Sequence, residues 1–167
     1  MTQQIFEAIR GLPPEWVVVI LSALPISEVR GGIPAGMIMG LPLGQVLPLA
    51  VVSNVVSVIP VVLGFNWVAE CLADKPLLGQ LITRLIRRAR AKEEMVNKHG
   101  VWAVTLFVAI PLPVTGAWTG SVVAAVFGMR FWRVLFCLTV GVLIASTIVT
   151  SLTVAGVHIF SALAAVP

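Results

Sequence analysis

Long runs of apolar residues, separated by short polar interruptions, dominate the chain. Four apolar blocks are visible, at about residues 14–41, 43–73, 101–128 and 132–160. A helix needs about 20 apolar residues to cross the hydrocarbon core of a bilayer, so each block is long enough for one crossing. The more polar segment between the second and third blocks, residues 74–99, divides the chain in two.

Proline and glycine interrupt the first and third blocks near their middles. Each of these blocks has two apolar arms around a break: arms 16–26 and 33–41 around 27–32, and arms 101–110 and about 118–128 around 111–116. An arm of about 10 helical residues is only about 15 Å long, half of the hydrocarbon core. The residues that we assign to the breaks are Pro25, Gly31, Gly32, Pro34, Pro111, Pro113, Gly116 and Gly120.

A repeat with an offset of 88 residues relates the two breaks. Leu24-Pro25-Ile26-Ser27 corresponds to Leu112-Pro113-Val114-Thr115 without a gap. The identical pairs at this offset are Leu24/Leu112, Pro25/Pro113, Gly32/Gly120, Gly40/Gly128, Val46/Val134 and Leu47/Leu135. Paired apolar segments interrupted by glycine or proline in corresponding halves are typical of the binding sites of transporters.

The basic residues distinguish two topologies: two re-entrant hairpins, or four kinked crossings. Nine of the eleven Lys and Arg residues lie within 74–99 or in the short loop that holds Arg130 and Arg133. Re-entrant hairpins put these two segments on one face of the membrane, whereas four crossings put them on opposite faces. Because basic loops are retained in the cytoplasm, we favour hairpins that enter from opposite faces, each followed by one long span.

The segment 74–99 has apolar residues at helical spacing beside a basic face. The apolar positions are Leu81, Ile82, Leu85, Ile86 and Ala89, and the basic ones are Arg84, Arg87, Arg88, Arg90 and Lys92. This pattern predicts an amphipathic helix on the cytoplasmic membrane surface. We therefore predict a single all-α membrane domain, residues 1–167, with a first repeat at 1–73, a linker at 74–99 and an inverted second repeat at 100–167.

Composition agrees with a membrane protein. Hydrophobic residues make up 59% of the chain, charged residues 11%, and the mean hydropathy is +1.05. The net charge of +4 comes from segments that flank the apolar blocks, so we expect no nucleic-acid partner. Cys71 and Cys137 lack metal-ligand spacing, and we expect no metal and no cofactor. No nucleophile–base pair or nucleotide-binding motif is present, which argues against an enzyme.

Glu28 and Arg30 are the only charged residues between Glu15 and Glu70. A charge at the bilayer centre costs about 2.5–3.5 kcal/mol on insertion scales, so such residues usually face a cavity and have a function. One interpretation is an ion pair that only fixes the first break. The other is that Arg30 binds an anionic group through its planar guanidinium, while Glu28 exchanges a proton or receives a cation.

The second break offers hydroxyl groups in place of charges. Thr115 and Thr119 lie there with Trp118, and the ends of broken helices add free N–H groups that suit an anion. The competing interpretation is that small residues here only allow close helix packing. Asn54, within the second block, is expected either to line a cavity or to form an interhelical hydrogen bond.

Two segments together resemble the bacterial and archaeal family of putative small multidrug export proteins. They are Glu28-Val29-Arg30-Gly31-Gly32-Ile33-Pro34-Ala35-Gly36 and Ala109-Ile110-Pro111-Leu112-Pro113-Val114-Thr115-Gly116-Ala117-Trp118-Thr119-Gly120. This family is similar to the DedA superfamily, whose members have two re-entrant hairpins and are implicated in proton-linked movement of lipids, including undecaprenyl phosphate. The resemblance implies roles for Glu28, Arg30 and residues 111–120. DedA proteins carry arginines in the second hairpin, whereas this chain has none between Val101 and Met129.

These observations predict a proton-coupled transporter of the prokaryotic inner membrane. Its substrate would be a small amphiphile with an anionic head, such as a lipid phosphate, bound by Arg30, while Glu28 carries the proton. Two alternatives stay open: a proton antiporter for lipophilic cations, and a membrane scaffold that transports nothing. Two long spans are few to shield two hairpins from membrane lipids, so we expect a homo-oligomer, namely a dimer.

Overall fold

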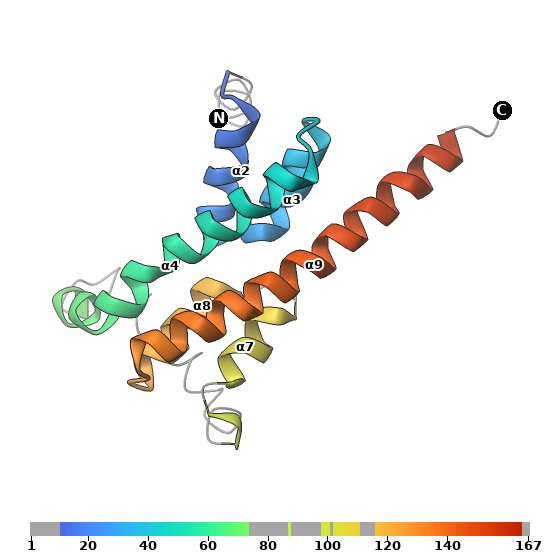
Figure 1. The fold of residues 1–167 in the computed structure, drawn as a ribbon. Coiled ribbons are helices and arrows are strands. Elements are labelled where there is room, and N and C mark those ends of the chain that lie inside the picture. The colour runs from blue at the N-terminus through green and yellow to red at the C-terminus, as the bar shows by residue number, and fades with distance from the viewer. Residues whose placement is uncertain (1–10, 74–86, 88–97, 101, 111–115, 165–167) are drawn as a thin grey trace.

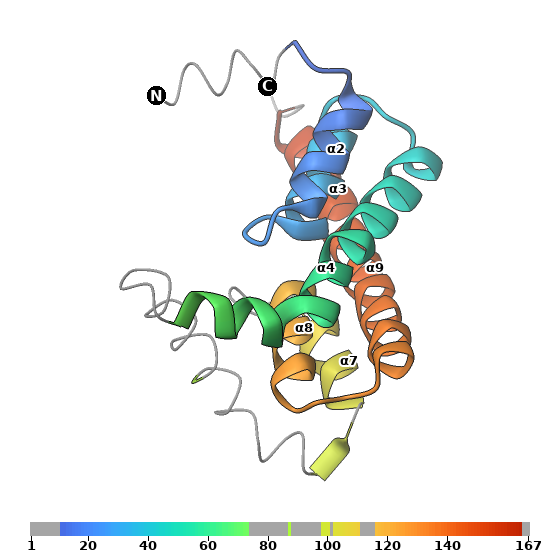
Figure 2. The same ribbon diagram turned by 90° about the vertical axis from the view of Figure 1, so that its left-hand side faces the viewer.

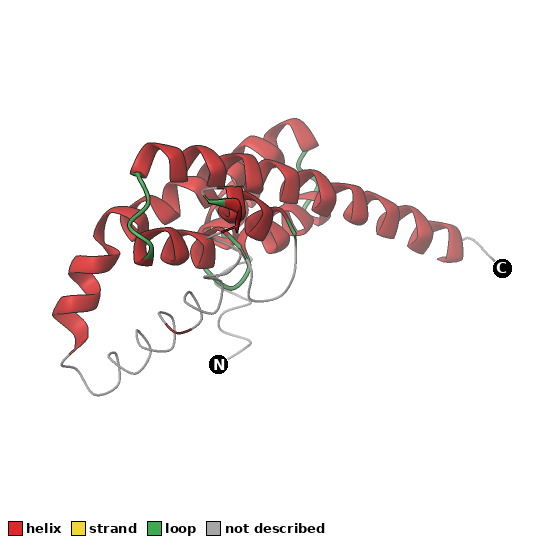
Figure 3. Ribbon diagram, turned by 90° about the horizontal axis from the view of Figure 1, so that it is seen from below, coloured by secondary structure: helices red, strands yellow, loops and turns green. Residues whose placement is uncertain are grey.

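The computed structural model describes residues 11–73, 87, 98–100, 102–110 and 116–164. This part of the chain consists of helices and loops, with no strand (Figures 1 and 3). The helices are α2 (Pro14–Ala23), α3 (Glu28–Ile38), α4 (Leu43–Ala73), α7 (Trp102–Ala109), α8 (Ala117–Val126) and α9 (Phe131–Ala164). The predicted all-α fold is confirmed for these residues.

The helices α4 and α9 are long and apolar enough to cross a membrane. Their apolar stretches are Leu43–Gly64, with 22 residues, and Phe131–Val157, with 27 residues. At 1.5 Å per residue these stretches measure about 33 and 40 Å, more than the hydrocarbon core of about 30 Å. Two candidate membrane spans therefore lie where the sequence predicted long spans.

Each long helix follows a pair of short helices. The two helices of the first pair run antiparallel, because Gly32 of α3 approaches Ser22 of α2 while Gly36 approaches Val18, one turn earlier in α2. In the second pair, Gly120 of α8 approaches Val108 of α7. Figures 1 and 2 show the two pairs at opposite ends of the molecule, with α4 and α9 running alongside both.

The predicted position of the first break was wrong. The sequence assigned residues 27–32 to it, whereas α3 begins at Glu28 and continues through Gly31, Gly32 and Pro34. The chain turns earlier, at residues 24–27, where Pro25 lies as expected. Gly32 has a packing role instead, since a Cβ atom there would collide with the Ser22 hydroxyl oxygen of α2.

Proline within a helix was also misread as a break. Pro34 lies inside α3, and α4 likewise contains Pro48 and Pro60. Helices in membranes tolerate proline where neighbouring groups satisfy the freed backbone. Gly120, which the sequence assigned to the second break, lies inside α8. Pro111, Pro113 and Thr115 lie outside the described residues.

The offset of 88 residues relates the helices as well as the sequence. Applied to the first residues of α2, α3 and α4, this offset gives positions 102, 116 and 131, and the later helices begin at Trp102, Ala117 and Phe131. Gly40 and Gly128 both have positive φ, at 83° and 60°, and end α3 and α8 in the same way. In each case the next residue donates its backbone N–H to the carbonyl five residues earlier, as in a Schellman motif.

The main helix contacts have counterparts when the two halves are exchanged. Within the halves, α2 packs on α4 as α7 packs on α9. Between the halves, α3 packs on α9 as α8 packs on α4. This correspondence supports an internal repeat, while its inversion across a membrane stays a prediction. The linker 74–99 lies outside the described residues except for Arg87, Lys98 and His99.

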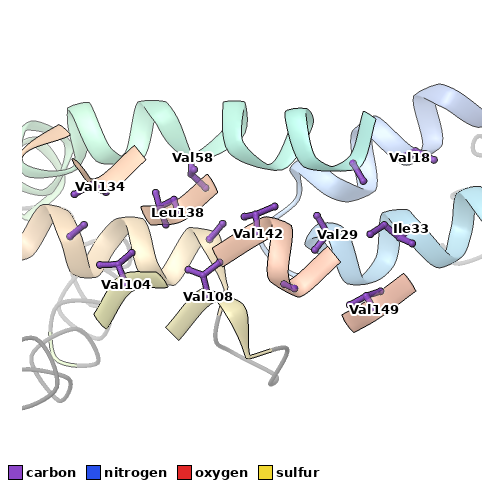
Figure 4. Close-up of a cluster of buried hydrophobic side chains, with 14 of the residues drawn as sticks. Val18, Val29, Ile33, Val58, Val104, Val108, Val134, Leu138, Val142 and Val149 are labelled. Carbon is purple, nitrogen blue, oxygen red and sulfur yellow. The ribbon is translucent and has the colours of Figure 1, made fainter. Parts of the chain in front are cut away.

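A large apolar cluster joins the two halves (Figure 4). Val29 and Ile33 come from α3, Val108 from α7, and Leu138 and Val142 from α9, and all five are almost fully buried. Small and β-branched side chains dominate this core. Because lipid is as apolar as these side chains, their close packing, more than exclusion of water, holds such helices together.

Candidate functional site

The C-terminal end of α2 is held by side chains from several other elements. The last carbonyl groups of any helix lack partners within the helix, and inside a membrane they must be satisfied by protein. Here the Ser22 carbonyl accepts from the Asn54 side-chain amide of α4 at 3.1 Å, and the Ala23 carbonyl accepts from the Trp118 indole N–H of α8 at 3.1 Å. The Ser27 hydroxyl donates to the Leu21 carbonyl. The turn after α2 is therefore fixed from both halves of the chain.

Glu28 joins this turn to the second helix pair. Its side chain is buried, and its Oε1 accepts a hydrogen bond from the Trp118 backbone N–H, in the first turn of α8, at 3.2 Å. The carboxylate thus binds the positive end of the α8 dipole, an interaction of up to about 2 kcal/mol in a partly buried setting. We call the end of α2, the start of α3 and the start of α8 the helix junction.

Glu28 is costly to place at the helix junction. Among the described residues it is the only non-glycine residue with positive φ, at 50°, which costs of the order of 1–3 kcal/mol. Removing a carboxylate from water costs several kcal/mol more. The α8 dipole, the backbone N–H groups of Trp118 and Ala117, and the Arg30 guanidinium offset part of these costs.

Gly116 faces Glu28 across the helix junction. A Cβ atom on Gly116 would collide with Glu28 Oε2, so the carboxylate leaves no room for a side chain here. At the offset of 88 residues, position 28 corresponds to position 116. The two equivalent residues thus meet, one with a carboxylate and the other without a side chain.

Arg30 connects the helix junction to a cavity. Its Nη2 lies 4.0 Å from Glu28 Oε2, and its side chain is 23% exposed. Arg30 also lines a cavity of about 320 Å³ together with Val149, Leu152 and Thr153 of α9. This cavity offers one guanidinium group beside a mainly apolar wall. The sequence did not predict that these α9 residues would face Arg30, because no local pattern relates a residue of α9 to one of α3.

The structure brings together four of the predicted site residues and Gly116. Glu28, Trp118 and Gly116 meet at the helix junction, Arg30 lies beside Glu28, and Asn54 reaches the end of α2. Asn54 forms an interhelical hydrogen bond, which is one of the two roles that the sequence left open for it. Thr119 follows in α8 and is half-buried. Thr115 lies outside the described residues.

The sequence did not reveal the partners of these side chains. The carbonyl groups of Ser22 and Ala23 are backbone atoms, which every residue carries, so no sequence signal distinguishes them. Within the described residues, no group of three or more His, Cys, Asp or Glu side chains could hold a metal ion. The charged side chains of the helix junction are those of Glu28 and Arg30.

Comparisons with known proteins agree with the two motifs at the helix junction. A comparison with curated proteins and one with solved structures found no match. A family model described as "Putative small multi-drug export protein" matches residues 28–148, which include Glu28, Arg30 and all of α8. The match begins at the first residue of α3 and covers well over half of the chain. Together with the two long apolar helices it indicates a membrane protein, and the chain belongs to this family of small multi-drug export proteins.

Proposed function

We propose that this chain is a proton-coupled transporter of an amphiphile with an anionic head, such as a lipid phosphate. The observation that carries the proposal is the position of Arg30, which opens onto a cavity with an apolar wall while its neighbour Glu28 is bound by α8. A guanidinium group binds phosphate oxygens through two parallel hydrogen bonds. The aliphatic side chains of Val149 and Leu152 suit the adjoining hydrocarbon.

The contact between Glu28 and Arg30 supplies a coupling between proton and substrate. When Glu28 is ionised, its charge partly compensates that of Arg30 at 4.0 Å. A proton on Glu28 removes this compensation and weakens the hydrogen bond to the Trp118 N–H. Arg30 then attracts an anionic head more strongly, so proton and anion bind together. The same proton loosens the contact between the two helix pairs. This contact is the part of the molecule that would move during transport.

The membrane arrangement is part of this proposal. We place both helix pairs as re-entrant hairpins in the prokaryotic inner membrane, with the linker 74–99 in the cytoplasm and α4 and α9 as the full crossings. The relation to the DedA superfamily stays a prediction. The correspondence between the halves and the short length of α2, α3, α7 and α8 support hairpins, since helices of 8–11 residues span about half of the hydrocarbon core.

A homodimer completes the proposal. The α4 stretch Leu43–Gly64 is 22% buried, against 44% for Phe131–Val157 of α9. Val52, Val56 and Leu63 are exposed on α4 and offer an apolar face for a second copy. Native mass spectrometry from lipid nanodiscs tests this proposal: dimers are expected, and a monomer that retains full transport would contradict it.

The transport proposal is tested by flux into liposomes that contain the purified protein. A fluorescent polyprenyl phosphate is the substrate, and a pH gradient is the driving force. Arg30→Ala is expected to lower the flux about tenfold or more, which corresponds to at least about 1.4 kcal/mol. Glu28→Gln should retain a low flux that no longer responds to the pH gradient. The matched control is Arg130→Ala, which removes one charge from an exposed loop residue outside the cavity.

A second candidate, export of lipophilic cations in exchange for protons, is favoured by the family description and by the buried carboxylate of Glu28. The same liposomes, loaded with a cationic dye, discriminate the two. Dye export that is lost in Glu28→Gln, without flux of the phosphate, would replace the proposed substrate by a cation. Flux of the phosphate at the wild-type level in both Arg30→Ala and Glu28→Gln would overturn the proposal, and no flux of either compound would favour a scaffold.

A further inference from the structure

A second cavity lies away from the helix junction, where α7 and α9 begin. Its volume is about 570 Å³, within the range of sites that hold small ligands. His99 lines it from the segment before α7, and Trp102 is the first residue of α7. The other lining residues lie in the first two turns of α9: Trp132, Arg133, Phe136 and Cys137. None of these residues takes part in the proposed transport site.

Two basic groups and three aromatic rings meet in this cavity. His99 and Arg133 are exposed, and among the described residues that line the cavity none is acidic. Trp102 and Phe136 pack edge to face, with ring centroids 6.4 Å apart and an interplanar angle of 80°. Cys137 is buried and forms part of the floor. The cavity therefore combines positive charge with a rigid apolar wall.

The exposed aromatic rings of the cavity are typical of a position at the membrane surface. The side chains of Trp102, Trp132 and Phe136 are 61%, 77% and 60% exposed. Tryptophan concentrates at the level of the lipid headgroups, where its ring contacts both hydrocarbon and water. Arginine at that level meets the phosphate groups of the lipids. An exposed aromatic rim beside Arg133 at that level suits a phospholipid of the surrounding leaflet, whose phosphate meets the arginine while its hydrocarbon meets the rings.

We propose that this cavity, lined by His99, Arg133, Trp102, Trp132 and Phe136, binds the headgroup of an anionic phospholipid from the surrounding leaflet. Arg133 and His99 bind the phosphate, and the upper part of an acyl chain lies against the aromatic rings. The lipid stays bound to α7 and α9 and is not the transported substrate. The lipid links the start of α7 to the start of α9.

The proposal is tested by titrating the purified, detergent-solubilised full chain with phosphatidylglycerol and, separately, with phosphatidylcholine, and measuring binding by native mass spectrometry. The wild type is expected to bind phosphatidylglycerol at least about tenfold more tightly than phosphatidylcholine. Arg133→Ala should remove this preference. Its matched control is Arg130→Ala, which deletes an exposed charge just before α9, outside the cavity, and should leave the preference within about twofold.

A second pair of variants tests the aromatic wall. Trp102→Ala is expected to weaken binding of phosphatidylglycerol several-fold, whereas Trp16→Ala, an exposed tryptophan on α2, should not change it. Thermal unfolding confirms that each variant is folded. Equal affinity for the two lipids, or equal losses in Arg133→Ala and Arg130→Ala, would overturn the proposal. Displacement of the lipid by millimolar inorganic phosphate would also overturn it, because the site would then take free phosphate.

Discussion

Glu28 and Gly116 occupy equivalent positions in the two halves, yet they differ in every chemical respect. Glu28 carries a buried charge at positive φ, and Gly116 leaves the space that this charge fills. An exact two-fold repeat has no room for both side chains at this point. The lack of symmetry is thus a consequence of packing as well as of chemistry, because a glutamate in one half requires a glycine in the other.

The first prediction concerns Gly116→Ala. The added methyl group collides with the Glu28 carboxylate, so the free energy of unfolding should fall by about 1–3 kcal/mol. Gly44→Ala is the matched control, because a Cβ atom at Gly44 meets no atom within 4 Å. In a Glu28→Ala background the penalty of Gly116→Ala should largely disappear. Unfolding in mild detergent measures all four variants, and an equal penalty in both backgrounds would contradict the contact.

At the level of the helices, some features of the fold could be predicted from local sequence and others could not. Gly40 and Gly128 mark the ends of α3 and α8. Helices often end at a residue with positive φ, a conformation that glycine adopts without strain. Gly31, Gly32 and Pro34 were misread as a break, because a sequence does not distinguish a glycine that turns the chain from one that admits a neighbouring helix. The second of these roles depends on Ser22, ten residues earlier in another helix.

The end of α2 shows the same limit for the candidate site. The sequence singled out Asn54 and Trp118 as polar or amphipathic residues among apolar ones, and the structure brings both to the helix junction. Their acceptors are backbone carbonyls, so the contacts depend on where α4 and α8 pass α2. Such long-range packing is not encoded in any local pattern.

The second prediction follows from this helix end. Trp118→Phe keeps the ring and removes the indole N–H that binds the Ala23 carbonyl. A buried carbonyl without a donor costs about 1–3 kcal/mol, so the unfolding temperature in detergent should drop clearly. Trp132→Phe, at a side chain that is 77% exposed, serves as the control and should have little effect. If both substitutions lowered the unfolding temperature equally, the hydrogen bond would not hold the turn.

At the level of the whole molecule, the offset of 88 residues links sequence, helix boundaries and packing. The same offset relates the starts of the three helices in each half, and helix contacts correspond between the halves. If basic segments stay on the cytoplasmic face, this arrangement requires the two helix pairs to enter the membrane from opposite faces. We therefore propose, as the central claim, an inverted repeat of two re-entrant pairs that meet around Glu28.

The sidedness of four single cysteines tests this claim most directly. The variants are made in a chain with Cys71 and Cys137 replaced by serine. Leu12→Cys lies just before α2 and Pro42→Cys just after α3, so the two mark the ends of the first pair that lie away from its turn. Lys98→Cys and Arg130→Cys likewise mark the second pair. A membrane-impermeant thiol reagent added to intact cells should label the first two sites, and should label the other two only after the cells are opened. Labelling of Leu12→Cys and Pro42→Cys from opposite faces would show that the first block crosses the membrane, and would contradict the account.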